Sequence, residues 1–354
     1  MIEMLFNYVA FHYLKKILII LMGLSGLFAG LDFLMNGSSL PSFNIKVLYA
    51  FFEWQEALSL LFPLAIIFGA IWTKIAFIKQ NSIAAMYSLG VTRKTLFKPF
   101  FVVSIFIYLI FLLLNFTSFA TARDSALNLL NNAYEVSETK DLFFKYDDNF
   151  VYIGTLIPQK YKMENITLFK LKNSEVIETF SANEAWYNID QWVATNVLKK
   201  TIVVDEQGHK HLKVESLEIL KTLKGYQPQI LKSIYDGKAL TLDRSIKALK
   251  LLKNQGLETH AIRTEIYKKA VMPLFAIALL MILLFNFPFH ARYMNMAVTT
   301  TKAIGGTLFV WGILFALLSI GKNGSLNPEG AIILPVVLLW IYAFYSLIKS
   351  QKRI

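Results

Sequence analysis

The sequence predicts an α-helical polytopic membrane protein with six transmembrane helices, three before and three after an inserted β domain. Three observations predict this fold class. The chain of 354 residues is 55% hydrophobic and only 17% charged, with a mean hydropathy of +0.48, whereas a soluble globular domain is about a quarter charged. Six apolar runs each approach the roughly 20 residues that cross a bilayer. A polar block rich in β-branched and aromatic residues separates the third run from the fourth.

The six apolar runs and the charges beside them predict the spans and their orientation. The predicted spans are residues 16–35, 57–78, 96–120, 270–289, 303–320 and 331–348. Lys and Arg gather at the N-terminus, the 2–3 loop, the 4–5 loop and the C-terminus, whereas the opposite short loops contain only Lys46 and Lys322. Because short cytoplasmic loops are enriched in Lys and Arg, we expect both termini in the cytoplasm and the polar block outside. The first run lacks a small-residue cleavage site, which indicates a retained span.

The polar block, residues 121–241, has the pattern of a β domain. Five β-rich segments, at residues 150–157, 165–172, 176–188, 192–204 and 210–219, are separated by turn signals. Strands in series without intervening helices predict an antiparallel sandwich or jelly roll. A helical period then predicts a connector over residues 242–269. The chain therefore divides into 1–120, 121–241, 242–269 and 270–354.

Large side chains are unusually frequent in the predicted strands. Phe150 and Tyr152 alternate with Val151 and Ile153, so this strand presents apolar groups to both of its faces. One face is expected to fill the domain core. The other could line a groove for apolar ligands, with Tyr152 and Leu168 as candidate inward positions, unless a two-layer core uses all of these side chains.

The stretch between the second and third spans, residues 79–99, is neither apolar nor loop-like. Ile83, Met86 and Tyr87 fall at i, i+3 and i+4, on one face of a short helix predicted over about residues 80–90. Gly90 suits the end of this helix, where a left-handed conformation is needed. The helix is either a docking element for a partner or a connector resting on lipid headgroups.

Most catalytic chemistries have no support in the sequence. Cys is absent, which removes disulfides, thiolate chemistry and Cys-based metal sites. There is no GxxxxGK[ST] phosphate loop, GxSxG elbow or HExxH motif, so a partner would have to hydrolyse any ATP that is used. His209 and His211 lack a third ligand nearby, and no metal site is expected. The net charge of +12 lies mainly around the apolar runs, which indicates membrane orientation and not nucleic-acid binding.

Ionisable residues near the outer span ends are candidate ligand contacts. Asp32 lies inside the first apolar run, where a charge usually faces a cavity or a partner, although it is close enough to the run's end to reach the interface. Arg123, at the outer end of the third run, has the same two interpretations. Lys46 is the only cation in its short loop.

Taken together, these segments resemble the LptF/LptG (YjgP/YjgQ) permease family of the lipopolysaccharide exporter over nearly the whole chain. The resemblance rests on NFVYI at residues 149–153, EIYKKAVMPL at residues 265–274, the loop at residues 287–292 and the Pro328…Leu334-Pro335 spacing. The NFVYI strand is more similar to the LptG member than to the LptF member. The family layout is three spans, a periplasmic β-jelly-roll domain and three further spans.

The resemblance implies a permease subunit of an ABC transporter in the bacterial inner membrane. Its expected partners are a second LptF/LptG-type permease, a cytoplasmic ATPase dimer that binds the ATP, and a periplasmic β-jelly-roll bridge protein. Lipopolysaccharide or lipooligosaccharide would enter a cavity between the two membrane halves and pass through the jelly rolls to the bridge. No cofactor of its own and no enzymatic activity are expected for this chain.

The resemblance and the residue patterns above together give the candidate site residues. For coupling to the ATPase they are Ser82, Ile83, Met86, Tyr87, Gly90 and Arg93; for the substrate they are Asp32, Lys46, Arg123, Tyr152 and Leu168. Ser82 stands where relatives commonly have an acidic residue that meets the ATPase, so docking is expected on Ile83, Met86, Tyr87 and the basic residues behind them. Ala29 stands where relatives can place a Lys, and leucines replace basic residues beyond the third span.

Three alternatives are compatible with the sequence. The chain could be the LptF-like partner or another ABC permease with a large periplasmic domain. It could be an ion-coupled secondary transporter, which needs discontinuous helices and several midplane ionisable groups, of which only Asp32 comes close. It could be a membrane anchor for a β domain, for which six spans are excessive.

Overall fold

The computed structural model of the chain describes residues 2–131, 138–147, 149–172, 175–204, 210–236, 238–286 and 295–351. These residues form two compact units. The helical unit consists of Met1–Ala126 and His260–Ile354, and the β unit of Leu127–Thr259. The predicted connector at residues 242–269 is thus divided between the two units.

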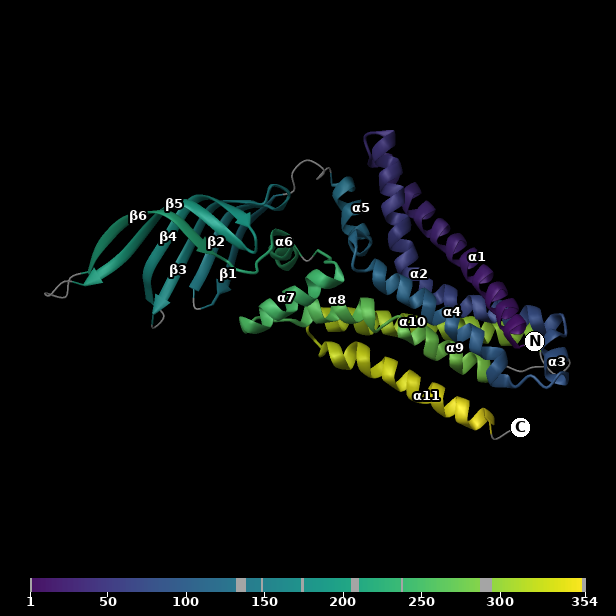
Figure 1. Cartoon of the computed structure of the whole chain (residues 1–354). Coiled ribbons are helices and arrows are strands. Elements are labelled where there is room, and N and C mark those ends of the chain that lie inside the picture. Colours follow the sequence, from purple (N-terminus) through teal and green to yellow (C-terminus); the bar gives the residue numbers. More distant parts are fainter. Residues whose placement is uncertain are drawn as a thin grey trace. The chain divides into compact units, whose positions relative to one another are not determined.

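The helical unit contains most of the helices of the chain (Figure 1). In chain order they are α1 (Ile2–Asn36), η1 (Gly37–Ser39), α2 (Phe43–Lys79), α3 (Ser82–Ser88), α4 (Arg93–Leu114), η2 (Ser118–Thr121), α5 (Ala122–Leu130, which continues into the β unit), α8 (His260–Ala270), α9 (Leu274–Asn286), α10 (Met296–Lys322), the π-helical turn η5 (Glu329–Ile333) and α11 (Leu334–Gln351).

Five helical segments in the described part of the chain are long and apolar enough to cross a membrane: α1, α2, α4, α10 and η5 with α11. A sixth crossing requires α8 and α9 together, which are bent by 43° at the break between them. The helices α1 and α2 have 35 and 37 residues, about 52 and 56 Å at 1.5 Å per residue. Both exceed the roughly 30 Å of a bilayer core, so the predicted spans cover only parts of these helices.

The break between α8 and α9 follows from Pro273, which has no backbone N–H to donate. The Leu274 N–H donates to Val271 O and not to Ala270 O, which frees the Ala270 carbonyl. The hydroxyl of Tyr108 on α4 donates to this carbonyl at 2.7 Å. A side chain from a neighbouring helix therefore supplies the hydrogen bond that the interrupted helix cannot make, as apolar surroundings require.

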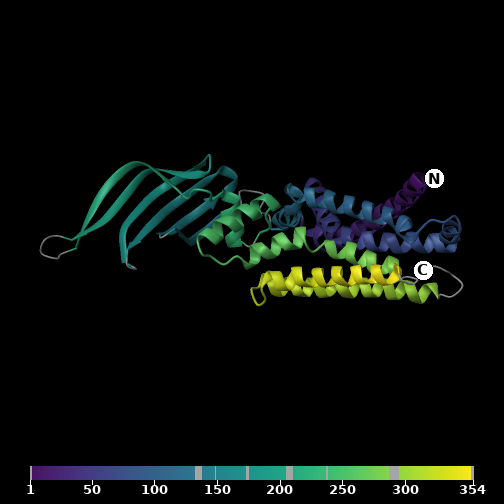
Figure 2. The same ribbon diagram turned by 60° about the horizontal axis from the view of Figure 1, so that its bottom comes forward.

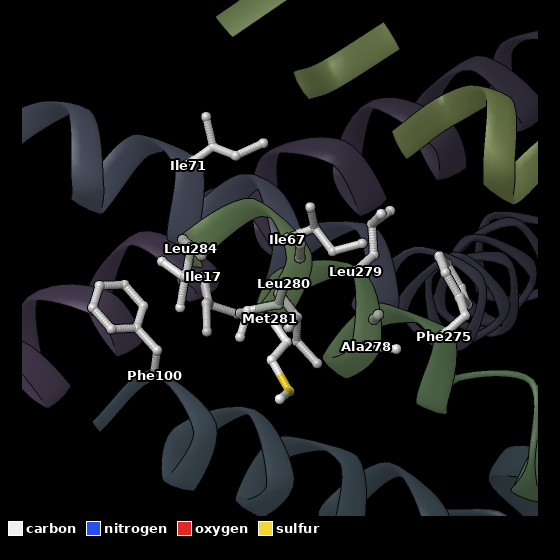
Figure 3. Close-up of a cluster of buried hydrophobic side chains, with 14 of the residues drawn as sticks. Ile17, Ile67, Ile71, Phe100, Phe275, Ala278, Leu279, Leu280, Met281 and Leu284 are labelled. Atoms are coloured by element: carbon white, nitrogen blue, oxygen red, sulfur yellow. The ribbon is translucent and has the colours of Figure 1, made fainter. Parts of the chain in front are cut away.

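The core of the helical unit forms around α9. Nine of its thirteen residues are buried, and Figure 3 shows α9 side chains among Ile17 of α1, Ile67 of α2 and Phe100 of α4. Helices α1 and α2 approach closely because Gly69 has no side chain. A Cβ at Gly69 would lie 2.7 Å from Cγ1 of Ile17, too close for any other residue at this contact.

The β unit contains one antiparallel sheet within the described residues (Figures 1 and 2). Its six strands are β1 (Thr139–Tyr146), β2 (Asn149–Ile157), β3 (Lys162–Lys172), β4 (Glu175–Asn188), β5 (Gln191–Val204) and β6 (Lys210–Thr222). A short turn, η3 (Pro158–Lys160), joins β2 to β3, and two helices, α6 (Pro228–Asp236) and α7 (Leu242–Asn254), follow the sheet.

The strand order is β1-β2-β3-β4-β5-β6, so each strand pairs with its neighbour in the chain. The five predicted strands are confirmed to within a few residues, and β1 was missed. The predicted jelly roll is not confirmed, because that fold consists of two sheets joined by Greek-key connections. The tight connections between successive strands favour neighbour pairing instead.

A row of irregular residues crosses the sheet and bends its strands. Asp141, Asn165 and Asn196 have left-handed φ angles of 56°, 53° and 53°. The register places Asp141 opposite Gly154, and Gly154 opposite Asn165. Asn and Asp tolerate this conformation better than other side chains.

The irregular row keeps one face of the sheet buried along its whole length. In β2 the buried Val151 and Ile153 are followed, three residues on, by Leu156, and in β3 Met163 is followed by Ile166. Strict alternation would have sent the later residues to the opposite face. The irregular residue in each strand thus returns the following apolar side chains to the buried face.

The buried face is covered in part by the segment that follows the sheet. Leu223, Tyr226 and Leu231 pack with the strand residues of this core. The indole N–H of Trp192, which is fully buried, donates to Tyr226 O at 2.7 Å. Residues of α6 and of the turn before it therefore cover part of the buried face.

We predict that Gly154→Ala destabilises the β unit, because the new Cβ would lie 2.9 Å from Cβ of Asn165. The expected cost is about 1–3 kcal/mol, as for overpacked cores. Adding Asn165→Gly removes the clashing atom, tolerates the left-handed φ and should recover most of this loss. Hydrogen exchange of β-unit amides in the full-length protein measures both effects. Unchanged exchange in Gly154→Ala would contradict the prediction.

Candidate functional site

The short helix predicted between the second and third spans is present as α3. It ends as its sequence predicts: Gly90 has φ of 78°, its N–H donates to Tyr87 O at 2.9 Å, and the Val91 N–H donates to Met86 O at 3.1 Å. This pair of bonds is the Schellman motif. The side chain of Thr92 then accepts a hydrogen bond from the Thr95 N–H at 3.3 Å and caps α4.

The face of α3 predicted to dock a partner is instead used by the chain itself. Ile83 is only 2% exposed, and Met86 and Tyr87 are half-buried against the same core. Apolar side chains at i, i+3 and i+4 form one helix face, which packs on the nearest apolar surface. For α3 that surface is the core of the helical unit. Ile83 is therefore a core residue. The exposed side chains of α3 and its C-cap are those of Ala84, Ala85, Ser88 and Leu89.

Two cations near α3 bind the end of α9. Arg93 Nη2 donates to Phe285 O at 2.5 Å, and Lys74 Nζ donates to Leu284 O at 2.8 Å. Lys74 is only 2% exposed, although it lies near the end of α2 on the side where the Lys and Arg residues of short loops gather. Burial raises the pKa of Tyr87 to about 12, against the opposing effect of the nearby Arg93 charge. Arg93 thus faces the chain's interior; Ser82 remains half-exposed at the start of α3.

Asp32 and Arg123, predicted as substrate contacts, belong to one cluster. The Tyr49 hydroxyl donates a short hydrogen bond to Asp32, and Asn36 Nδ2 donates to the same carboxylate at 3.1 Å. Arg123 Nη1 lies 4.0 Å from Asp32 Oδ2 and 3.2 Å from both carboxylate oxygens of Glu53. Glu53, which is fully buried, was missed because the predicted second span begins at residue 57.

The contacts of this cluster make Arg123 a weaker candidate than Lys46 for binding an anionic ligand. Two carboxylates surround the one guanidinium of Arg123, so an incoming anion would have to displace Glu53 or Asp32. Lys46 lies in the first turn of α2, on the same helix face as Tyr49 and Glu53. Among the described residues Lys46 makes no ion pair. Lys46 is therefore the more available of the two cations for an anionic ligand.

Tyr152 and Leu168 lie on opposite faces of the sheet. Tyr152 pairs with Thr167, and Leu168 pairs with Val151 on the buried face. The Tyr152 hydroxyl donates to Asp141 Oδ1 at 2.6 Å, and this carboxylate raises the pKa of the phenol. A groove on one face can therefore be lined by only one of these two residues.

An ion pair that the sequence did not indicate joins α8 to η5. Arg263 Nη1 and the Tyr267 hydroxyl donate to Glu329 Oε1 at 2.7 and 2.8 Å. Within the described ranges no three His, Cys, Asp or Glu residues gather at metal-binding distance. His209 and the loop at residues 287–292 lie outside the described residues.

Comparison with known families identifies one match over nearly the whole chain. The family model described as "Lipopolysaccharide export system permease LptF/LptG" matches residues 7–349. A search of the curated proteins finds no match.

We predict that Arg123→Gln destabilises the helical unit by leaving Glu53 without its partner. Removing one member of a fully buried ion pair costs about 3–5 kcal/mol. Since Arg123 is 46% exposed, we expect about 1–3 kcal/mol. The double variant Arg123→Gln with Glu53→Gln should recover part of this loss. Denaturant unfolding in detergent measures the cycle, and strictly additive effects would show that the pair is not coupled.

Proposed function

Because the chain belongs to the LptF/LptG family of lipopolysaccharide export permeases, we propose that it is an LptG-like subunit of an ABC transporter in the bacterial inner membrane. A second permease of the same family and a cytoplasmic ATPase dimer complete this transporter. The family is one of transport permeases and not of enzymes, so the ATP is bound by the partner ATPase. The observation that supports this proposal best is α3, a short capped helix between two membrane-capable helices.

The proposed topology has six crossings, with α8 and α9 acting as one broken span. Both termini and α3 then face the cytoplasm, and the β unit is periplasmic. The charge distribution supports this orientation, since the Lys and Arg residues of short loops gather on the α3 side of the helical unit. The β unit takes the place of the family's periplasmic jelly-roll domain.

The ATPase is proposed to dock on the exposed side of α3. Leu89 is 67% exposed, and the neighbouring Ala84, Ala85 and Ser88 are small enough to let a partner surface approach closely. An exposed leucine at the end of a short helix can anchor the helix in an apolar groove of the partner. In this proposal the exposed side of α3 has the docking role that an acidic residue at the position of Ser82 has in relatives. It also has the docking role that was expected for Ile83.

Ion-coupled transport has less support. The break between α8 and α9 supplies one discontinuous helix. Two carboxylates near this break are already paired with cations, however: Glu329 with Arg263 at 2.7 Å, and Glu265 with Lys322 at 4.0 Å. A coupling ion would need carboxylates that are not already held by cations.

For the lipid path, we propose that phosphates contact Lys46 and that acyl chains follow the buried face of the sheet. Leu168 is at the edge of that face, still 8% exposed, with Phe180 opposite it on β4. Beyond it, Lys170 and Lys199 lie 3.0 Å from Glu178, so the face changes from apolar to charged. The exposed edge strand β6 offers unpaired backbone groups to which a strand of the periplasmic bridge protein could add.

We predict that Leu89→Asp releases the ATPase while the permease stays folded. Burying a leucine side chain contributes about 1.5–3 kcal/mol, so its loss should weaken ATPase binding by at least about tenfold. Co-purification in mild detergent measures the retained ATPase. Leu326→Asp, at an exposed leucine between α10 and η5, is the matched control and should retain it. Equal ATPase yields from both variants would exclude docking through Leu89.

We also predict that a photo-reactive amino acid at Leu168 captures lipopolysaccharide only when ATP is supplied. The same group at Tyr152 is the control, because it faces the other side of the sheet. At Val214, an exposed residue of the edge strand β6, it should capture a periplasmic β protein. Equal lipid capture at Leu168 and Tyr152 would show that the buried face is not the lipid path.

A further inference from the structure

The C-terminal end of α9 is held by side chains from two other helices. The last four carbonyls of a helix have no partner within it, and water is not available in apolar surroundings to supply one. Here Lys74 of α2 donates to Leu284 O at 2.8 Å and Arg93 of α4 donates to Phe285 O at 2.5 Å. Charged donors near a helix C-terminus also interact favourably with its dipole.

Aromatic rings connect these two cations. Lys74 Nζ lies 5.1 Å from the ring centroid of Phe97, and Arg93 Cζ lies 5.4 Å from that of Phe285. The two rings meet edge to face, with centroids 5.5 Å apart and an angle of 85° between their planes. We call Lys74, Arg93, Phe97 and Phe285 the α9 cap. Three helices contribute to it, and each of its members contacts another.

The apolar side chains around Lys74 restrict where its ammonium group can find a hydrogen-bond acceptor. The gap between α2 and α9 at this point is otherwise lined by apolar side chains: Ile67, Ala70, Ile71, Leu280, Leu283 and Leu284. An ammonium group in such surroundings needs acceptors at fixed places. The Leu284 carbonyl provides one, so a displacement of α2 relative to α9 would separate a charge from its acceptor.

The α9 cap is also close to α3 along the chain. Lys74 lies in the last two turns of α2, which ends at Lys79, and Arg93 is the first residue of α4. The helix α3, residues Ser82–Ser88, is between them, and its Ile83, Met86 and Tyr87 pack on the same core. Both cations that hold α9 therefore lie on the segments that flank α3.

We propose that the α9 cap transmits the movement of α3 to α9, with Lys74 and Arg93 as positioning residues that couple the ATPase to the lipid cavity. This inference rests on the proposed docking of the ATPase on α3. When α3 moves, the two cations pull the α9 carbonyls with them, because separation would break two charge-assisted hydrogen bonds in apolar surroundings. The buried helix α9 then carries the displacement into the core of the unit.

The test uses the intact transporter in proteoliposomes and the variant Lys74→Met, which keeps the apolar stem and removes the charge. We expect the ATPase to remain bound and ATP hydrolysis to continue, while lipopolysaccharide released per ATP falls by about tenfold, within the usual range of coupling effects. Lys98→Met is the matched control, because Lys98 is an exposed cation of α4 outside the α9 cap; it should behave as the unmodified transporter.

A second readout separates coupling from general stability. The chain has no Cys, so Asn286→Cys, at the exposed end of α9, introduces a single thiol. In the otherwise unmodified transporter its labelling rate by a water-soluble reagent should change when nucleotide binds. With Lys74→Met added, that nucleotide-dependent change should disappear. A variant that was only less stable would label faster in both states.

The outcomes distinguish this inference from the proposed function. If Lys74→Met releases lipid at the ordinary ratio to ATP and keeps the nucleotide-dependent labelling, the α9 cap does not transmit the movement, and docking on α3 is unaffected. If no ATPase co-purifies with the unmodified chain, both proposals are wrong. Should Lys74→Met fail to insert, Arg93→Lys replaces it: a lower ratio supports the inference, and an unchanged ratio overturns it.

Discussion

Polar groups inside the apolar helical unit must find partners within the chain, and this requirement organises the unit. The clearest case is α9, whose terminal carbonyls at Leu284 and Phe285 receive Lys74 and Arg93. At the break just before α9, the Ala270 carbonyl accepts a hydrogen bond from the Tyr108 hydroxyl. Side chains of α2 and α4 thus bind carbonyls at both ends of α9. Such ties cost more to break than in water, because no solvent replaces the lost hydrogen bond.

The same physical rule explains why predicted functional charges turned out to be internal contacts. Arg123 is within 4.0 Å of both Asp32 and Glu53, and Arg93 is directed at α9. A guanidinium near an apolar core pairs with the nearest acceptor before any ligand arrives. Among the described residues Lys46 makes no ion pair, and Leu89 is exposed. For this reason the proposed lipid and ATPase contacts are placed on Lys46 and Leu89 instead of Arg123 and Ile83.

The β unit is subject to a different constraint: one face of its sheet must stay apolar although the strands bend. Asp141, Gly154, Asn165 and Asn196 interrupt the alternation where the strands bend. Each interruption moves the next side chain back to the buried face. A straight, strictly alternating sheet of this length would expose half of its large residues on the wrong side. The result is a single bent sheet with a core of its own, closed in part by α6.

From the sequence alone it was possible to predict the class of the protein, five of the membrane-capable helices, five of the six strands, the end of α3 at Gly90 and the family. These features depend on local composition and on periods of 2 and 3.6 residues, which can be counted along the chain. Strand β1 was missed because Asp141 interrupts its pattern. The three-dimensional arrangement was needed to show which face of α3 is buried, that Glu53 and Lys74 are interior residues, and that the strands form one sheet. Those outcomes depend on contacts between residues up to 210 positions apart, and no local pattern contains the distance between such residues.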